Sequence, residues 1–329
     1  MDLKISDKKR LLLGLLVVLM LIYPYLVGNS TYFMTLFVMT CIYVISSMAL
    51  NLLIGYGGQI SVGHAGFLSV GGYSVAILTS KLGLPFFIVL PLAGIITGII
   101  GLLIGLPAVR LRGHFLAVAT LGFGLSIPQL ALNWDTLTGG YSGLAVVKPA
   151  LFSSNLQLFY VVVFITVVII WLMYNIVKSR LGRAFIAIRD SEVAAQSIGI
   201  NISFYKTTMF VISAFFTGIA GGIYGYWSGF VSPNDFIIVT SFLILAMIVV
   251  GGLASIPGSI IGAILFTIIP HFTNSYIGIT NIVIGLAVVV IILFKPDGIV
   301  SIFKVKNSKV DNETKKIVNQ RGEKENVGV

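Results

Sequence analysis

Few side chains in this 329-residue sequence could carry out acid–base, nucleophilic or metal chemistry. The histidines, His64, His114 and His271, are spread along the chain and show no spacing typical of a metal site or an acid–base pair. Cys41 is the single cysteine, so no disulfide can form within one chain and a metal site is not expected. No G-x-x-x-x-G-K-S/T loop for ATP phosphates occurs. These residue types predict that the chain is not an enzyme and binds no cofactor of its own.

The acidic residues, eleven in all, fall in loops or tails outside the long apolar runs. Carriers driven by protons or cations usually place an ionisable group at mid-membrane, because that group binds the driving ion. Its absence disfavours a proton-driven carrier, although a sodium site built from carbonyl and hydroxyl oxygens would need no such group. A stand-alone secondary carrier therefore stays as an alternative, and an integral membrane enzyme lacks the titratable cluster it would need.

One polar segment within the apolar pattern could contact a transported solute. Residues Gly55–Gly72 read GYGGQISVGHAGFLSVGG, and Gln59, Ser61 and His64 are polar groups among the glycines. Glycine permits breaks in membrane helices where the backbone lines a cavity, and it also allows close helix packing. We expect Gln59, Ser61 and His64 to line or border a permeation path, with helix packing as the alternative. Two further glycine clusters have the same packing interpretation: Thr217–Gly229 and Gly251–Gly262.

A second polar segment, residues 178–206, interrupts the apolar pattern in the middle of the chain. It reads KSRLGRAFIAIRDSEVAAQSIGINISFYK and is basic and weakly amphipathic. Asp190 or Ser191 is a candidate N-cap, Glu192 suits a first helical turn, and Gly199 is typical of the position after a helix. A helix of about eight residues is marginal alone in water, so we expect it to dock against a partner protein. The alternative is a connector on the membrane surface.

The elements that position these segments are predicted to be membrane-spanning helices. Apolar residues make up 57% of the chain and charged residues only 10%, whereas a soluble domain carries about a quarter charged residues. The apolar runs do not alternate with polar residues, which disfavours a β-barrel. We predict an all-α integral membrane protein with about ten spans, the third and ninth of which could be broken or re-entrant. In chain order the spans are Leu11–Val27, Phe33–Ile54, Ser61–Ser80, Leu84–Leu106, Phe115–Trp134, Leu158–Val177, Thr207–Phe230, Phe236–Gly252, Ser259–Phe272 and Ile279–Phe294.

The basic residues follow the positive-inside rule if both termini are cytoplasmic. All of the 21 basic residues except Lys81 and Lys148 then lie on the cytoplasmic side. The net charge of +10 is explained by this topology, and no nucleic-acid-binding motif accompanies it. We expect residues 1–303 to form the transmembrane domain, including the cytoplasmic loop 178–206, and residues 304–329 to form a disordered cytoplasmic tail.

Three segments taken together match one family of membrane proteins. They are GGQISVGHAGFLSVGGYSVAIL, GLPAVRLRGHFLAVATLGFG and GRAFIAIRDSEVAAQSIGINISFYK, and the match runs from about Asn51 to Phe294. The chain resembles the permeases of branched-chain amino acid ABC transporters, and the M-type subunit more than the H-type.

Permeases of ABC importers carry an E-A-A-x-x-x-G element on the loop that docks into the ATPase. This sequence has one extra residue, Val193, between the glutamate and the alanines. The resemblance implies an ATPase-coupling role for the residues in and beside this element: Arg189, Asp190, Glu192, Ala194, Ala195 and Gly199.

The resemblance also implies the chain's partners and substrate. The chain would be one permease of an importer of leucine, isoleucine or valine in the plasma membrane of a prokaryote. Its partners would be a second homologous permease, two ATPase subunits that bind ATP and magnesium, an extracytoplasmic substrate-binding protein, and membrane lipid. Urea, short amides or sugars are alternative substrates within the same class of transporter. A path lined by small, neutral polar groups suits an aliphatic zwitterion.

Overall fold

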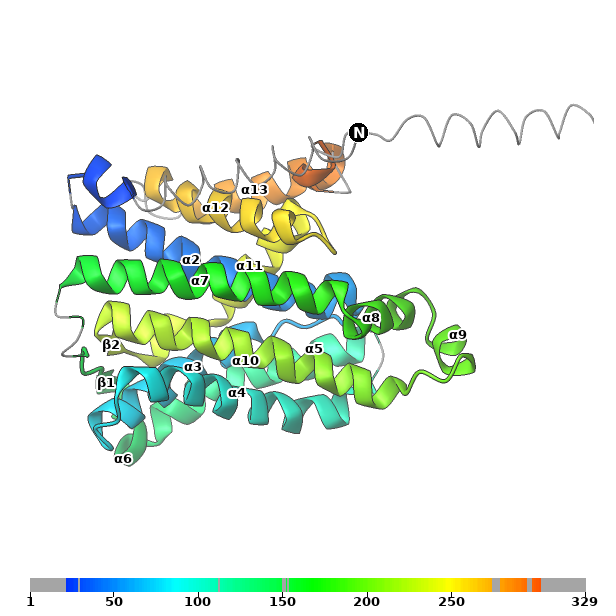
Figure 1. Ribbon diagram of the computed structural model, residues 1–329, viewed down its shortest axis with the longest axis horizontal. Coiled ribbons are helices and arrows are strands. Elements are labelled where there is room, and N and C mark those ends of the chain that lie inside the picture. Colours follow the sequence, from blue (N-terminus) through cyan, green and yellow to red (C-terminus); the bar gives the residue numbers. More distant parts are fainter. Residues whose placement is uncertain are drawn as a thin grey trace, which may run out of the picture.

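A bundle of long helices that run roughly along one axis makes up the protein (Figure 1). The computed structural model describes residues 22–28, 30–111, 113–149, 152, 154–273, 279–294 and 298–302. Most of the predicted first span, Leu11–Val27, and the whole predicted tail, residues 304–329, lie outside these residues. The long helices are α2 (Thr31–Asn51), α3 (His64–Ser80), α4 (Phe86–Ala108), α5 (His114–Asn133), α7 (Asn155–Lys178), α10 (Ile202–Ser228), α11 (Ile238–Gly251), α12 (Ile256–Thr273) and α13 (Ile279–Phe294).

Short elements close the two ends of the bundle. The strands β1 (Leu144–Ala145) and β2 (Phe230–Val231) pair antiparallel, with Leu144 opposite Val231. The short helices are α6 (Asp135–Thr138), α8 (Arg180–Asp190) and α9 (Glu192–Ser197), with 3-10 turns at Gly140–Ser142, Pro233–Phe236 and Ile299–Ile302 and a π-helical turn at Leu52–Tyr56.

The predicted class, a mostly helical membrane protein, is confirmed. Among the described residues, seven helices are long and apolar enough to cross a membrane, by length and composition. Helices α3 and α13 are shorter, with 17 and 16 residues. The total of ten spans stays a prediction.

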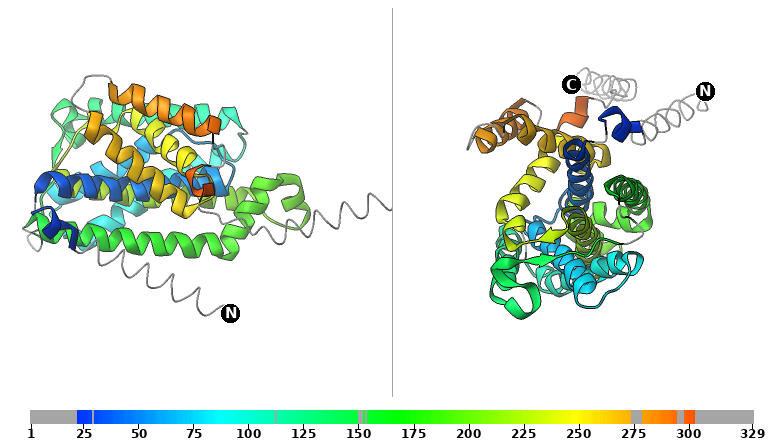
Figure 2. Two further views of the ribbon diagram at one scale, coloured as in Figure 1. Left: turned by 90° about the horizontal axis from the view of Figure 1, so that it is seen from above. Right: turned by 90° about the vertical axis from the view of Figure 1, so that its left-hand side faces the viewer.

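Helices α2 and α10 lie in the interior of the bundle (Figure 2). Helix α10 packs most closely against α4 and α3, because glycines bring the backbones together. A Cβ atom on Gly71 would lie 2.1 Å from the Gly218 carbonyl oxygen, and one on Gly218 would lie 2.3 Å from Thr97 Oγ1. Helix packing is therefore the observed role of these glycines.

The third predicted span does not begin where the sequence suggested. Helix α3 starts at His64 rather than at Ser61, and residues 57–63 are irregular and largely buried. Gly58 has a φ of +66°, which favours glycine and prevents the helix from continuing. The break thus lies before α3, and α3 itself is one continuous helix. Helix α12, the ninth predicted span, is also one unbroken helix, and it starts three residues before the predicted Ser259.

The central loop is more helical than predicted. Helix α8 was not expected, and it buries Phe185 and Ile188 on one face. Helix α10 begins at Ile202 instead of Thr207, because Asn201 caps it by accepting a hydrogen bond from the backbone N–H of Phe204. Lys206 therefore lies within α10, although the sequence analysis placed it in the loop.

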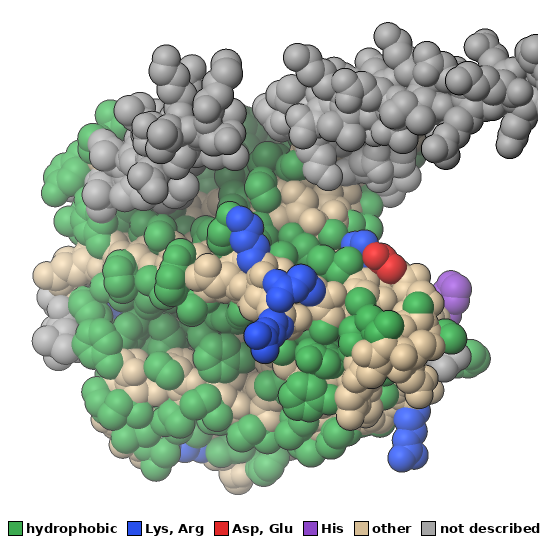
Figure 3. Space-filling view, turned by 45° about the vertical axis from the view of Figure 1, so that its right-hand side comes forward, with side chains coloured by type: hydrophobic (Ala, Val, Ile, Leu, Met, Phe, Trp, Pro, Cys, Tyr) green, Lys and Arg blue, Asp and Glu red, His purple; other side chains and the backbone are tan. Residues whose placement is uncertain are grey.

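Basic side chains gather at the end of the bundle that carries α8 and α9, whereas the flank is covered by hydrophobic side chains (Figure 3). At the opposite end, Lys81 donates a hydrogen bond to the Thr136 carbonyl oxygen and Lys148 donates one to Asn155. The described basic residues near α8 and α9 are Arg110, Lys178, Arg180, Arg183, Arg189 and Lys206. This separation agrees with the charge distribution that the topology requires.

Candidate functional site

Asn51 holds two irregular segments together near the end of α2. It is 1% exposed, and its Nδ2 donates hydrogen bonds to the Ser255 carbonyl oxygen at 3.0 Å and to Ser259 Oγ at 2.7 Å. Its Oδ1 accepts a hydrogen bond from the backbone N–H of Ala254 at 2.9 Å. The break after α2 is thereby tied to the turn between α11 and α12. The sequence analysis missed Asn51, although a buried amide in an apolar span was a signal that it needs partners.

Ser61 and His64 lie in a buried network that joins the break to α2 and α10. Both residues are 0% exposed. Ser213 Oγ donates to the Ala49 carbonyl oxygen at 2.7 Å, so His64 Nε2, 2.9 Å from that hydroxyl, is assigned as the donor to it. His64 Nδ1 lies 3.5 Å from Ser61 Oγ, at the limit of a hydrogen bond. These two predicted pathway residues are brought together, and they fix the start of α3.

Gln59 differs from its neighbours because its polar atoms have no partner. The residue is 4% exposed, and both Oε1 and Nε2 are buried without a hydrogen bond among the described residues. It lines a polar pocket of about 300 Å³ at the α8–α9 end of the bundle. The pocket also includes Arg189, Asp190, Glu192 and Lys206, so the structure unites one predicted pathway residue with the predicted coupling residues.

Helix α5 covers the break on one side. The backbone N–H of Val62 donates to Thr120 Oγ1 at 3.0 Å, and a Cβ on Gly63 would lie 2.4 Å from the Thr120 carbonyl oxygen. Ser61 and His64 therefore lie behind α5. The outward face of α5 carries small and polar residues in its second half, flanked by two exposed leucines: Gly122, Ser126, Gln129 and Asn133, with Leu125 and Leu130 beside them. The outward face of α4 is instead aliphatic, with Ile95, Ile99 and Leu103 exposed.

Helix α9 has the caps that the sequence predicted. Ser191 Oγ accepts a hydrogen bond from the backbone N–H of Ala194 at 3.2 Å, which confirms Ser191 as the N-cap. Gly199 follows the helix with a φ of +84°, and the N–H of Ile200 donates to the Ala195 carbonyl oxygen at 3.0 Å. The helix has only six residues.

The tip of α9 presents apolar side chains to the outside. Val193 is 77% exposed and Ile198 is 75% exposed, whereas Ala195 is buried. Ala194 and Gly199 are also exposed. Exposed apolar side chains on a short, capped helix fit a protein contact, and they equally fit a connector on the membrane surface.

The base of this helical loop is attached directly to the break. Arg189 Nη1 donates to the Gly55 carbonyl oxygen at 2.9 Å, and Arg189 Nη2 pairs with Asp190 Oδ1 at 2.8 Å. A Cβ on Gly58 would lie 2.9 Å from Arg189 Cγ, so glycine makes room for the arginine stem. Glu192 Oε1 forms an ion pair with Lys206 Nζ at 2.5 Å, and this buried partner was not anticipated.

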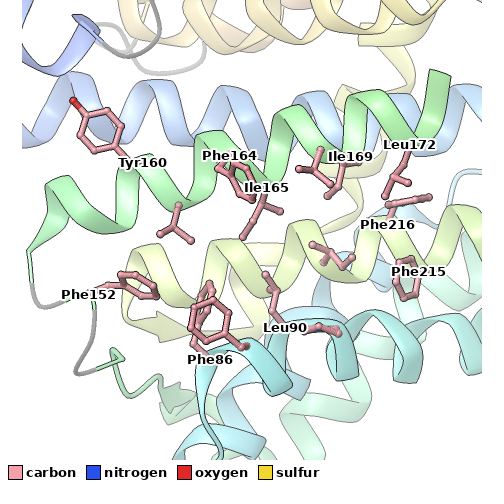
Figure 4. A pocket seen from close by; sticks show the side chains of 15 residues that line it. Phe86, Leu90, Phe152, Tyr160, Phe164, Ile165, Ile169, Leu172, Phe215 and Phe216 are labelled. Carbon is pink, nitrogen blue, oxygen red and sulfur yellow. The ribbon is translucent and has the colours of Figure 1, made fainter. Parts of the chain in front are cut away.

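A larger pocket lies elsewhere and has a different chemistry. It has a volume of about 660 Å³ and lies between α4, α7 and α10, with Phe86, Phe164 and Phe216 among its lining side chains (Figure 4). Its lining contains no charged side chain. A zwitterion would lose its hydration there without compensation, so this pocket is not a candidate path.

Comparison with known proteins identifies similar chains over most of this sequence. Residues 32–294 match the family described as the permease component of branched-chain amino acid transport systems. The chain is 32% identical to the high-affinity branched-chain amino acid transport system permease protein LivM of Escherichia coli, over 93% of this chain and 79% of the relative. It is 26% identical to the corresponding permease protein BraD of Pseudomonas aeruginosa, over 78% and 91%. No solved structure matches it.

Proposed function

The chain belongs to the family of permease components of branched-chain amino acid transport systems, and on that premise we propose that it is one permease subunit of an ATP-driven importer of leucine, isoleucine and valine. The names of its relatives support the substrate class. The absence of a phosphate-binding loop from the sequence supports ATP hydrolysis, with magnesium, on two separate ATPase subunits. An extracytoplasmic binding protein would deliver the amino acid.

The observation that carries this proposal is the connection between α9 and the helix break. Val193 and Ile198 offer an apolar tip to an ATPase, and Arg189, at the base of the same loop, bonds to Gly55 in the broken segment. A push or pull on α9 would therefore reach the irregular backbone at residues 57–63, which continues neither the helical turn before it nor α3 after it. Arg189, Asp190, Glu192, Ala194, Ala195 and Gly199 are the proposed coupling residues.

The proposed orientation places the α8–α9 end in the cytoplasm, where the ATPases are. Ten spans with both termini cytoplasmic, in the plasma membrane of a prokaryote, complete this topology. The segregation of basic residues supports it, because positive side chains are retained on the cytoplasmic side.

The second permease is proposed to pack against the outward face of α5. Gln129 is exposed on that face, and Asn133 donates a hydrogen bond to its backbone carbonyl oxygen. An exposed side-chain amide would be unfavourable against lipid. Gly122 allows a neighbouring helix to approach closely. A homologous permease offers both helices and polar groups, whereas the aliphatic face of α4 suits lipid.

The proposed path uses Gln59, Ser61 and His64 in different ways. Gln59 borders the path at the polar pocket, and its buried amide makes no hydrogen bond among the described residues. Ser61 and His64 border the path by fixing the start of α3 behind α5.

The test of this proposal is an acidic substitution at the tip of α9. Val193→Asp and Ile198→Asp should insert normally and keep the elution profile of the wild type, because both side chains are exposed. We expect them to lose co-purification with the ATPase subunits and ATP-dependent leucine uptake, since a charge would have to be buried at the contact.

Tyr141→Asp is the matched control, because Tyr141 is 82% exposed at the opposite end of the bundle. It should retain co-purification with the ATPases. If the α9 variants also retain co-purification and uptake, α9 is a connector and the coupling proposal is wrong.

A further inference from the structure

The apolar pocket between α4, α7 and α10 opens on the flank of the bundle and has the walls of a site for a hydrocarbon chain. Its volume is about 660 Å³. Side chains of α7, such as Phe164 and Ile165, meet those of α4, such as Phe86 and Leu90, across it (Figure 4). The absence of any charged side chain from its lining means that an apolar occupant would enter without loss of polar hydration.

A cluster of cations lies where α7 passes into α8. Its members, Lys178, Arg180 and Arg183, are all exposed, and none of them forms an ion pair with a carboxylate among the described residues. Lys178 Nζ lies over the Tyr174 ring, 4.1 Å from its centroid, and Arg183 Nη1 donates to the Lys178 carbonyl oxygen at 3.3 Å. This basic cluster therefore presents positive charges that the described part of the chain does not compensate.

The start of α8 adds to this positive field. Arg180 is the first residue of α8 and Arg183 lies one turn further on, while the first turn contains no acidic residue. The N-terminus of a helix favours an anion, because its backbone N–H groups carry partial positive charge there. Arginines at this end are repelled by the helix dipole, and a bound anion would offset that repulsion. The basic cluster is thus suited to an anionic group.

The apolar pocket and the basic cluster lie on the same flank. Phe164, Trp171 and Lys178 follow each other at intervals of seven residues, about two turns of α7, and all are exposed on one face of it. Phe164 also lines the pocket. Helix α8 contacts both α7 and α10, so the basic cluster lies at the end of the space between these two helices (Figure 1).

The spacing between the two features matches a phospholipid. Leu172, the last lining residue on α7, lies six residues before Lys178, about 9 Å along the helix. The polar layer of one leaflet is about 5–8 Å thick, so a phosphate at the basic cluster places the start of its acyl chains near Leu172. From Leu172 to Tyr160 the pocket follows α7 for about 18 Å, slightly more than half of the hydrocarbon thickness of about 30 Å.

We propose that the apolar pocket and the basic cluster form one binding site for a phospholipid with an anionic headgroup. One acyl chain fills the pocket, and the phosphate contacts Lys178, Arg180 and Arg183. The lipid joins α7 to α8, which leads into α9, and so stabilises the corner from which the coupling loop projects. The site does not depend on the transported solute. Only its assignment to the cytoplasmic leaflet rests on the orientation proposed above.

Native mass spectrometry of the full chain, purified in detergent and titrated with lipid, tests the headgroup contact. Dioleoyl phosphatidylglycerol should bind saturably. Dioleoyl phosphatidylcholine, which has the same chains and no net charge, should bind about tenfold more weakly. Glycerol 3-phosphate, which has the phosphate without an acyl chain, should not displace the bound lipid.

Matched double variants test the cations. Arg180→Gln with Arg183→Gln should weaken phosphatidylglycerol binding about tenfold or more, because each cation near an anionic lipid adds to the affinity. Lys81→Gln with Arg110→Gln removes the same charge away from the pocket, since Arg110 lies beyond the other end of α4 from Phe86. This control should bind like the wild type.

A variant within the pocket tests the acyl chain. Leu172 is 37% exposed and lines the pocket, so Leu172→Trp fills part of it without a change in the buried core. It should weaken phosphatidylglycerol binding. Val167→Trp is the control, because Val167 is similarly exposed on α7 and does not line the pocket. Thermal unfolding in detergent checks that each variant is folded.

Three results would overturn the proposal. Equal binding of the two lipids would show contact with hydrocarbon only, and unchanged binding in Leu172→Trp would place the acyl chain outside the pocket. Absence of bound lipid would mean that protein covers the pocket, such as the first predicted span or the second permease. These measurements involve neither ATPase nor transport, so their failure leaves the proposed importer function intact.

Discussion

Glu192 and Lys206 form the ion pair that fixes α9 against α10, and the pair makes a prediction at the scale of single residues. Lys206 is almost completely buried, whereas the Glu192 side chain keeps 34% of its surface exposed. Glu192→Lys places two cations together and should lower the free energy of unfolding by about 1–3 kcal/mol. The exchange variant Glu192→Lys with Lys206→Glu should recover part of this loss.

The measurement is thermal unfolding of the purified chain in detergent. Asp190→Asn is the comparison, because the Arg189–Asp190 pair is more exposed and its loss should cost less than about 1 kcal/mol. If Glu192→Lys and Asp190→Asn lower the unfolding temperature equally, burial of Lys206 does not increase the contribution of the Glu192–Lys206 pair to stability.

Local signals in the sequence predicted part of this site. Ser191 as the N-cap and Gly199 after the helix depend only on neighbouring residues, and both are confirmed. Asn51 and Lys206 find their partners through tertiary packing, at Ser255 and Ser259 for Asn51 and at Glu192 for Lys206. Pattern reasoning cannot identify such partners. The roles of the coupling and pathway residues stay predictions.

At the scale of helices, glycine has two different functions that substitution can separate. A Cβ on Gly218 would collide with Thr97 of α4, while one on Gly122 of α5 would meet open space. Gly218→Ala should therefore lower the stability of the chain by about 1–3 kcal/mol through overpacking. Gly122→Ala should leave it unchanged or slightly stabilised, because alanine favours the helix.

Size-exclusion profiles and thermal unfolding in detergent would check both variants. If α5 packs against a second permease, Gly122→Ala should instead reduce recovery of the two permeases as a complex. If Gly122→Ala destabilises the chain and Gly218→Ala does not, another helix of this chain packs against Gly122, where the structure has open space.

The helical elements were predictable where the apolar runs are long, and less so at their ends. The glycine content indicated a break near the start of α3. The exact residue at which α3 begins, His64, depends on tertiary contacts such as the hydrogen bond from Val62 to Thr120. Helix α8 was missed although its apolar residues, among them Phe185 and Ile188, recur at the spacing of one helical face. The sequence analysis searched this segment only for the short helix that follows.

At the scale of the whole molecule, the two ends of the bundle differ in charge and in the elements they carry. One end has α8, α9 and most of the described basic side chains, and the other has β1, β2 and α6. The positive-inside rule assigns the first end to the cytoplasm. The apolar pocket between α4, α7 and α10, on the flank between these ends, is consistent with a surface that meets lipid.

This orientation can be measured with cysteines placed at each end. The background is Cys41→Ala, and the labelled positions are Ser197→Cys on α9 and Tyr141→Cys near β1, since both side chains are exposed. In cells that express this chain alone, a membrane-impermeant maleimide should label Tyr141→Cys directly and Ser197→Cys only after permeabilisation. The reverse pattern would invert the topology and move α8 and α9 to the outside, where no ATPase could reach them. Labelling of both positions in intact cells would mean that the bundle does not separate these two ends across the membrane, and the coupling role of α9 would fail with it.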